Sequence, residues 1–195
     1  MKYQVYGIGN QTHIRETLEW KVLDKQGDQV RLISATPTSF SLILKGTSGY
    51  NGGVSRIDGL CAIYGGSKGT AQGLKIEDIQ ACLINDYTSL NWVKTIVDED
   101  WIDSKYHELF INNGSNLPHY WLSSNCFSYG DASSIEREGA MRVISNGWLR
   151  CWSLFHWSSG MVRDQYEEQA KVRPVVTLNS NVEVTGGNSE TGWTI

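Results

Sequence analysis

Long apolar runs, proline and any excess of positive charge are missing or scarce in this chain of 195 residues. No run approaches the ~20 apolar residues of a membrane-spanning helix, so we expect no membrane insertion. The 17 basic and 21 acidic residues are scattered without a basic block, which disfavours nucleic acid as a partner. The first six residues lack the apolar core of a signal peptide, and nothing else in the sequence indicates a cellular location.

The motifs of metal and redox chemistry are missing as well. The four cysteines are far apart without a Cys-x-x-Cys pair, which excludes a local zinc knuckle or dithiol motif. We interpret them as four buried thiols, with one disulfide left open because the sequence does not show which positions meet. The four histidines have no His-x-x-x-His spacing. We therefore predict neither a cofactor nor a metal; the cysteines are Cys61, Cys82, Cys126 and Cys151.

The spacing of apolar residues predicts an α+β chain that forms one domain over residues 1–195. Strands of period two, and a hairpin with Trp20 as its largest apolar side chain, are expected in the first quarter. Apolar residues three and four positions apart then predict two helices on one side of the sheet. The expected strands are 3–6, 41–44 and the hairpin 18–34 with its turn at 25–28; the expected turn is 46–53; the expected helices are 54–64 and 75–83; residues 85–118 are left as helix or loop.

The C-terminal third combines aromatic, arginine and small polar residues, a composition typical of recognition surfaces. Residues 120–160 hold four of the eight tryptophans, and regularly placed glycines predict short strands and long turns instead of helices. Strict alternation would place Trp152 and His156 on one face and Phe155 and Trp157 on the other. Both faces carry large rings, so the strand either buries both faces or buries one and displays the other; we expect some of the rings to be displayed to solvent or to a partner.

The predicted ligand-binding surface lies within residues 125–165. It combines a loop at its start with the displayed side of an extended segment. Arg173, in the hydrophobic strand 172–178, is instead expected to bind backbone or carboxylate groups of the framework. The predicted ligand-binding residues are Asn125, Phe127, Tyr129, Asp131, Trp148, Arg150, Trp152, His156, Trp157 and Arg163; those expected on the buried side are Ile135, Met141, Val143, Leu149 and Leu154.

Six blocks of this sequence, in their order, resemble a group of uncharacterised domains common in phages and prophages of Gram-positive bacteria. The blocks extend over most of the chain. In some relatives of that group, the segment between the last two blocks is of the kind that diversity-generating retroelements rewrite, so the resemblance implies a variable segment here. The blocks are Trp20–Leu23, Leu32–Pro37, Gly49–Val54, Ile76–Ile79, Tyr120–Ser124 and Val172–Val182.

The same group looks like a relative of the C-type lectin fold, in the branch that includes the formylglycine-generating enzymes. The resemblance implies a small mixed antiparallel sheet and two helices that support a long irregular C-terminal segment, with a glycine-centred strand at 141–148. The calcium-binding strings Glu-Pro-Asn, Gln-Pro-Asp and Trp-Asn-Asp do not occur, which disfavours calcium-dependent sugar binding. Formylglycine-generating activity is disfavoured because twenty-four residues separate Cys126 from Cys151.

Composition and resemblance together predict a non-catalytic, retroelement-diversified protein that binds a host-surface or other macromolecular target. The expected partner is a protein or a cell-surface ligand, and homo-oligomerisation is left open. One alternative is a virion structural or assembly module that uses the same surface as an oligomer interface. A second alternative is an enzyme with a cysteine or histidine nucleophile, for which Cys126 and Cys151 are the candidates.

Overall fold

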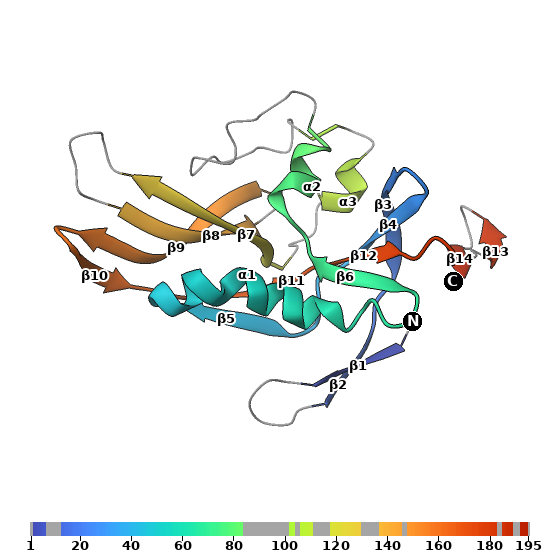
Figure 1. Ribbon diagram of the computed structural model, residues 1–195, viewed down its shortest axis with the longest axis horizontal. Coiled ribbons are helices and arrows are strands. Elements are labelled where there is room, and N and C mark those ends of the chain that lie inside the picture. Colours follow the sequence, from blue (N-terminus) through green and yellow to red (C-terminus); the bar gives the residue numbers. More distant parts are fainter. Residues whose placement is uncertain are drawn as a thin grey trace.

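Strands make up most of the described chain and helices pack on them, which is an α+β architecture (Figure 1). The computed structural model describes residues 2–6, 13–83, 102–103, 106–110, 118–129, 137–145, 148–182, 185–188 and 192–194. Asp131, Ile135 and most of the 85–118 stretch lie outside these ranges. Two small hairpins lie near the ends of the chain: β1 (Lys2–Tyr6) pairs with β2 (His13–Thr17), and β13 (Thr185–Asn188) pairs with β14 (Gly192–Thr194).

A four-stranded antiparallel sheet contains the hairpin that the sequence predicts over residues 18–34. Gly27 has a φ of +60° in its turn, a conformation that glycine adopts without strain. Trp20 is partly buried, and its ring meets Tyr64 edge-on at 6.1 Å. The strand order is β3 (Trp20–Gln26), β4 (Gln29–Ser34), β12 (Pro174–Leu178) and β6 (Gly69–Gly73).

A six-stranded sheet forms the other half of the architecture, and its strands are antiparallel except where β11 runs parallel to β7. β9 and β7 have 11 and 10 residues, so the expected short strands are long ones. Residues 141–148 do not form one strand, because β8 ends at Ser145 and β9 begins at Trp148. The order is β10 (Met161–Gln165), β9 (Trp148–Ser158), β8 (Arg137–Ser145), β7 (Tyr120–Tyr129), β11 (Glu167–Val172) and β5 (Ser41–Lys45).

Helix α1 (Gly46–Ala62) begins eight residues earlier than the sequence predicts, so the expected turn at 46–53 is wrong. The glycines that suggest a turn are places where the helix packs closely on its neighbours. A Cβ on Gly49 would lie 3.0 Å from the Leu44 carbonyl carbon, and one on Gly53 would lie 2.9 Å from the Met141 sulfur. Small residues here let the helix approach the sheet.

Helix α2 (Ile76–Gln80) is shorter than expected and is followed in the described chain by the single turn α3 (His107–Phe110). The side chain of Asp78 caps α2, accepting a hydrogen bond from the Lys75 backbone N–H at 2.9 Å. In the described ranges, no helix combines the length and the apolar character needed to cross a membrane.

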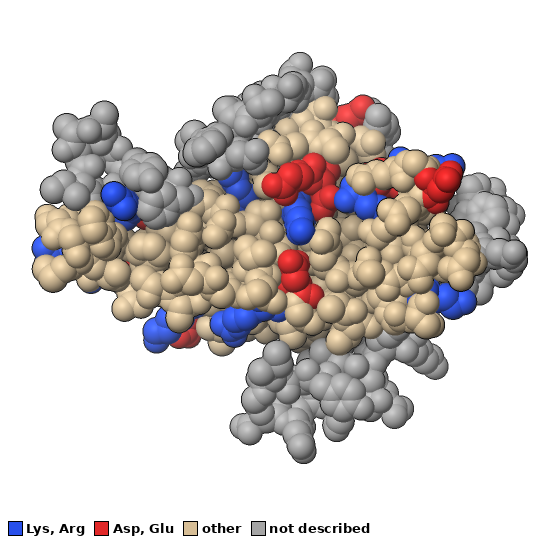
Figure 2. Space-filling view, in the orientation of Figure 1, with Lys and Arg blue, Asp and Glu red and all other residues tan. Residues whose placement is uncertain are grey.

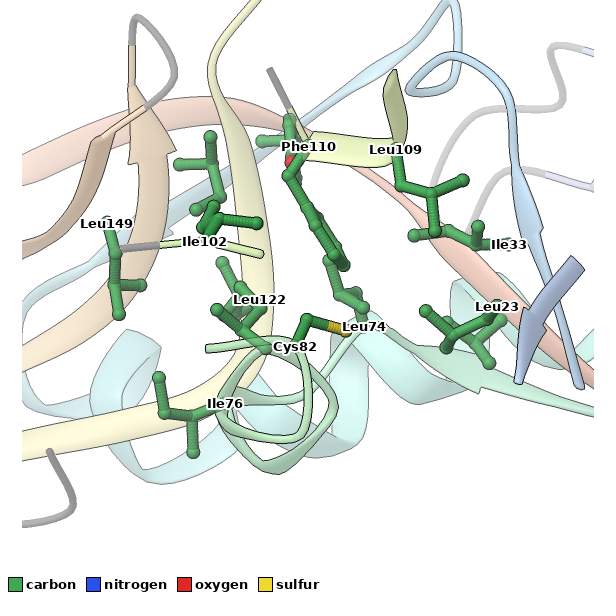
Figure 3. Packing of buried hydrophobic residues seen from close by; sticks show 14 residues of the cluster. Leu23, Ile33, Leu74, Ile76, Cys82, Ile102, Leu109, Phe110, Leu122 and Leu149 are labelled. Carbon is green, nitrogen blue, oxygen red and sulfur yellow. The ribbon is translucent and has the colours of Figure 1, made fainter. Parts of the chain in front are cut away.

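The two main helices cover opposite faces of the six-stranded sheet, not one side as the sequence suggests. Alternate residues of β7 show this: Tyr120 and Leu122 join a cluster with α2 and α3, whereas Trp121 joins a cluster with α1. Figure 3 shows the ring of Phe110 extending into the first of these clusters. β7 therefore belongs to both cores.

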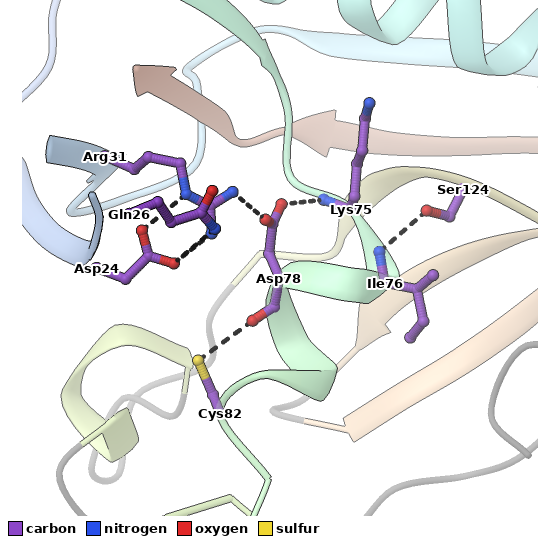
Figure 4. A network of polar contacts seen from close by, with 8 residues as sticks. All are labelled: Asp24, Gln26, Arg31, Lys75, Ile76, Asp78, Cys82 and Ser124. Carbon is purple, nitrogen blue, oxygen red and sulfur yellow. Dashed lines mark hydrogen bonds and ion pairs between the residues drawn. The ribbon is translucent and has the colours of Figure 1, made fainter. Parts of the chain in front are cut away.

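Two arginines tie the framework together. The buried Arg173 donates to the Ser34 and Ala35 carbonyl oxygens and to the Tyr120 hydroxyl, which confirms its expected framework role. Arg31 bridges Asp24 on its own hairpin and Asp78 on α2, as Figure 4 shows. The second contact, between Arg31 and Asp78, is 2.6 Å long and nearly buried.

Candidate ligand-binding surface

The candidate surface is built around β9, the strand that carries most of the predicted ligand-binding residues. β9 pairs with β8 from Trp148 to Trp157 and with β10 only at its C-terminal end. Ser159 and Gly160 connect β9 to β10, and both have positive φ values, of 51° and 83°. This is the type I′ geometry of a tight hairpin, and it fixes the register in which Trp157 faces Val162.

A β-bulge at Leu154 changes which side chains of β9 share a face. Ala140 pairs with Ser153 and Gly139 pairs with Phe155, so Leu154 is the extra residue. After Leu154, the alternation of side chains between the two faces of β9 is therefore shifted by one residue. Trp152, Phe155 and Trp157 lie on the α1 face, and His156 lies on the opposite face. The prediction that Trp152 shares a face with His156 and not with Trp157 is wrong, because strict alternation ignores the bulge.

Trp152 is half-buried and packs against the framework. Its ring meets Trp121 edge-on at 5.5 Å and His119 at 5.1 Å. Trp121 is in turn fixed by its indole N–H, which donates to the Leu42 carbonyl oxygen at 2.9 Å. Trp152 thus contributes to the α1 core cluster.

Phe155 is buried between β8 and the first turns of α1. Its ring lies directly over Gly139, where a Cβ would come within 2.1 Å of it, and meets Tyr50 of α1 edge-on at 5.4 Å. Gln165, the β10 partner of Phe155, lies against Gly46 at the start of the helix. The helix therefore covers this row of the sheet.

The next row of the same face continues beyond the helix. It consists of Arg137 on β8, Trp157 on β9 and Val162 on β10, which pair across the three strands. The Arg137 guanidinium carbon lies 4.8 Å from the centre of the Trp157 ring, a cation–π arrangement. Trp157 is half-buried, Arg137 is exposed and Val162 is 39% exposed. We call these three residues the Arg137–Trp157–Val162 row.

Exposed apolar side chains continue around this end of the molecule. Met161 begins β10 and Tyr166 directly follows it, and all five residues of that strand are exposed. Figure 2 shows the end formed by β9 and β10 as mostly uncharged on the face in view, with a few basic atoms at its border. A shallow hollow between β9 and the start of β11 lies nearby, lined by Glu138, Cys151, Trp152, Ser153, Tyr166 and Glu168.

Trp148 and Arg150 lie at the other end of β9. The Arg150 guanidinium carbon is 5.3 Å from the centre of the Trp148 ring, and both side chains are half-buried. Trp157 lies nine positions after Trp148, which is roughly 30 Å along a strand. The structure therefore does not bring all the predicted residues into one cluster.

The opposite face of the β9–β10 end is polar. His156 pairs across the strands with Glu138 and Asp164, and its Nδ1 lies 3.8 Å from the Asp164 carboxylate. Arg163 is the extra residue of a bulge in β10 and is exposed. His156 and Trp157 therefore offer different chemistry to opposite sides.

Residues 125–129 belong to strand β7 and pair with β8, so the predicted loop is wrong over these positions. Asn125 is exposed, whereas the neighbouring Cys126 is buried. Phe127 and Tyr129 are placed by their backbone pairing with Gly139 and Arg137. Asp131 lies outside the described residues. Of the residues expected on the buried side, Met141, Val143, Leu149 and Leu154 are buried, and Ile135 also lies outside the described residues.

The alternative of a cysteine nucleophile depends on the surroundings of the four cysteines. None of the four cysteines, which all lie in the described ranges, forms a disulfide; three are buried and Cys151 is half-buried. Cys151 pairs across the sheet with Arg142, and no group of three or more His, Cys, Asp or Glu residues in the described ranges is arranged to hold a metal. Burial raises the pKa of the Cys61 thiol well above its ordinary value.

Sequence reasoning missed Arg137, Val162, Met161 and Tyr166. The Ser159–Gly160 pair between two extended segments is a hairpin signal, and from it the pairing of Trp157 with Val162 follows. Arg137 could be found only once the register of β8 against β9 is known.

Comparisons with protein-family models, with curated proteins and with solved structures find no match for this chain.

Proposed function

We propose that this chain is a non-catalytic ligand-binding protein that recognises a host-surface protein or another exposed macromolecule through residues 125–165. The Arg137–Trp157–Val162 row carries the proposal, because it continues the sheet beyond its covering helix. Tryptophan and arginine are the residues most enriched at binding hot spots. A partner that covers Val162 and the exposed part of Trp157 gains roughly 25 cal/mol for each Å² of apolar surface removed from water.

We further propose that the fold is C-type lectin-like, in the formylglycine-generating-enzyme branch, and that a retroelement diversifies this segment. The α+β make-up supports the first part. The placement of the aromatic segment between β7 and β12, whose residues carry two of the resembling blocks, supports the second. A near-identical template repeat beside a reverse transcriptase gene, with mismatches confined to adenines in the codons for 125–165, is the expected genomic arrangement. Mismatches concentrated in the codons for β3 or β4 would contradict it.

The binding surface is testable with intact Gram-positive cells as the probe. Fluorescently labelled protein should bind to cells of a susceptible strain, and protease treatment of the cells should abolish the binding if the target is a protein. Trp157→Ala and Arg137→Ala should each weaken binding about tenfold or more, as truncation of a hot-spot residue does. Their melting temperatures should stay close to that of the unaltered protein, since both side chains lie at the rim of the sheet.

Two matched variants make this result interpretable. Val22→Ala removes an apolar side chain that is 58% exposed on β3, in the other sheet, and should leave binding unchanged. Trp152→Ala should lower the free energy of unfolding by about 2–3 kcal/mol, because that ring packs on Trp121 and His119. Unchanged binding in Trp157→Ala and Arg137→Ala, or an equal loss in Val22→Ala, would overturn the proposal.

A further inference from the structure

The six-stranded sheet has two ends, and the end opposite to the candidate surface is the strand β5. Among the described residues, no strand pairs with its outer edge. On the inner side it pairs with β11 over all five residues without a register shift. Such a regular, unpaired edge is a template for pairing with another chain. The strand at the other end, β10, is interrupted by its bulge at Arg163 and is therefore a poorer template.

The hydrogen bonds next to β5 show which of its residues face the open edge. The Gly46 N–H donates to the Tyr166 carbonyl oxygen at 3.0 Å, directly after the pair Lys45–Glu167. In an antiparallel ladder the backbone groups alternate in direction, so those of Leu42 and Leu44 point toward β11. The N–H and C=O groups of Ser41 and Ile43 and the N–H group of Lys45 consequently point outward, whereas the Lys45 carbonyl oxygen lies at the N-cap of α1 and accepts a hydrogen bond from the Ser48 hydroxyl at 3.1 Å.

The side chains of the strand alternate in the same way. Leu42 and Leu44 are buried against α1, whereas Ser41, Ile43 and Lys45 are exposed. Ile43 is 45% exposed at the centre of the strand. An apolar, β-branched residue in this position fits a second strand beside it better than it fits water.

The arrangement is self-complementary. Antiparallel pairing about a two-fold axis at Ile43 would place each Ile43 opposite its copy and each Ser41 opposite Lys45 of the second copy. No like charges then face one another directly, and the outward N–H and C=O groups of each Ile43 pair with those of its copy. Lys45 is meanwhile neutralised within its own chain by Glu167, at 3.3 Å. An interface of this kind suits a closed two-fold dimer.

We propose that the open edge of β5 pairs with the β5 edge of a second copy of this chain, which joins two six-stranded sheets into one. This inference goes beyond the proposed function and does not depend on it. Because β5 and β10 lie at opposite ends of each sheet, the dimer keeps both Arg137–Trp157–Val162 rows free. Two rows on one particle would strengthen attachment to a surface that carries many target molecules.

Light scattering coupled to gel filtration tests the dimer. The full chain should show the mass of a dimer that dissociates on dilution, and Ile43→Lys should raise the dissociation constant about tenfold or more by placing two lysines opposite each other. Val22→Lys, which adds the same charge at an exposed position of β3, should leave the dimer unchanged. An equimolar mixture of Ile43→Lys and Ile43→Glu should recover the dimer. A monomer throughout, or an oligomer that Ile43→Lys does not weaken, overturns the proposal.

Cysteine cross-linking tests the register. In a Cys151→Ser background, which removes the most accessible native thiol, Ile43→Cys should form an intermolecular disulfide on mild oxidation, since directly opposed Cα atoms lie about 5.5 Å apart. Ser41→Cys should not, because its copy lies four residues away along the strand. Cross-linking of Ser41→Cys with none of Ile43→Cys would show a different pairing and overturn the proposed one. Cell binding by either variant reports on the proposed function separately.

Discussion

Trp152 and Trp157 show how two identical residues on one strand acquire different roles. Both lie on the α1 face of β9 and both are half-buried. Trp152 meets Trp121 and His119 and completes the core under α1. Trp157 instead lies beyond the start of the helix, where its neighbours are an arginine and an exposed valine. Trp157 lies five residues farther along β9 than Trp152, beyond the cover of α1. Its ring is therefore displayed, whereas the ring of Trp152 packs in the core.

The Arg31 bridge gives a prediction at the same scale. Hydrogen bonds from Arg31 hold the pKa of Asp24 below its ordinary value, so the ion pair stabilises the fold above that value and is lost as the pH falls through the folded-state pKa. Asp24→Asn should lower the free energy of unfolding by about 1 kcal/mol at pH 7, a modest amount because the pair is partly exposed. The difference from the unaltered protein should shrink from about pH 4 downward.

Urea unfolding at several pH values measures this difference. Asp28→Asn provides the control, because Asp28 is exposed on the turn of the same hairpin. A difference between Asp24→Asn and the unaltered protein that stays constant down to about pH 2 would contradict the assignment of the bridge.

At the scale of elements, the sequence predicts which segments are strands better than it predicts the face that each side chain takes or the residue at which a helix begins. The hairpin 18–34 and the strand at 41–44 are confirmed because their apolar residues alternate and a glycine turn separates the hairpin strands. The start of helix α1 is predicted too late along the sequence, because glycine is favoured both in turns and where a helix packs closely on its neighbours. The faces of β9 are misassigned because nothing local in the sequence indicates the bulge at Leu154, which depends on the pairing with β8. Long-range contacts decide these points.

Alanine substitutions at two glycines of α1 distinguish the effect of close packing on stability from the effect of helix propensity. Gly59 has open space around it, so Gly59→Ala should raise the free energy of unfolding by about 0.5–1 kcal/mol, the difference in helix propensity. Gly49→Ala gains the same propensity but places a Cβ against the Leu44 backbone, which cannot move aside as a flexible side chain can. It should therefore be destabilising, by about 1–3 kcal/mol.

Denaturant unfolding of the two variants, each compared with the unaltered chain, shows directly whether each substitution raises or lowers the free energy of unfolding. Far-ultraviolet circular dichroism should show that both keep their helix content. Stabilisation by Gly49→Ala would mean that the first turns of α1 do not pack closely on β5.

At the scale of the whole molecule, the shared strand β7 decides whether the two cores unfold together. Tyr120 and Leu122 belong to the cluster with α2, and Trp121 belongs to the cluster with α1. Because adjacent residues of one strand point into both clusters, neither core can open without disturbing the other. A single domain over residues 1–195, as the sequence predicts, thus requires that both cores unfold together.

The four cysteine thiols report on this cooperativity, since Cys61 lies in one cluster, Cys82 lies in the other, and Cys126 lies on β7. Alkylation at neutral pH should modify only Cys151 in the folded protein, because the other three thiols are buried. In a urea series read by mass spectrometry, Cys61 and Cys82 should become reactive at the same midpoint. Two separate midpoints would show that the cores unfold independently and that the chain contains two folding units, with β7 released from one before the other.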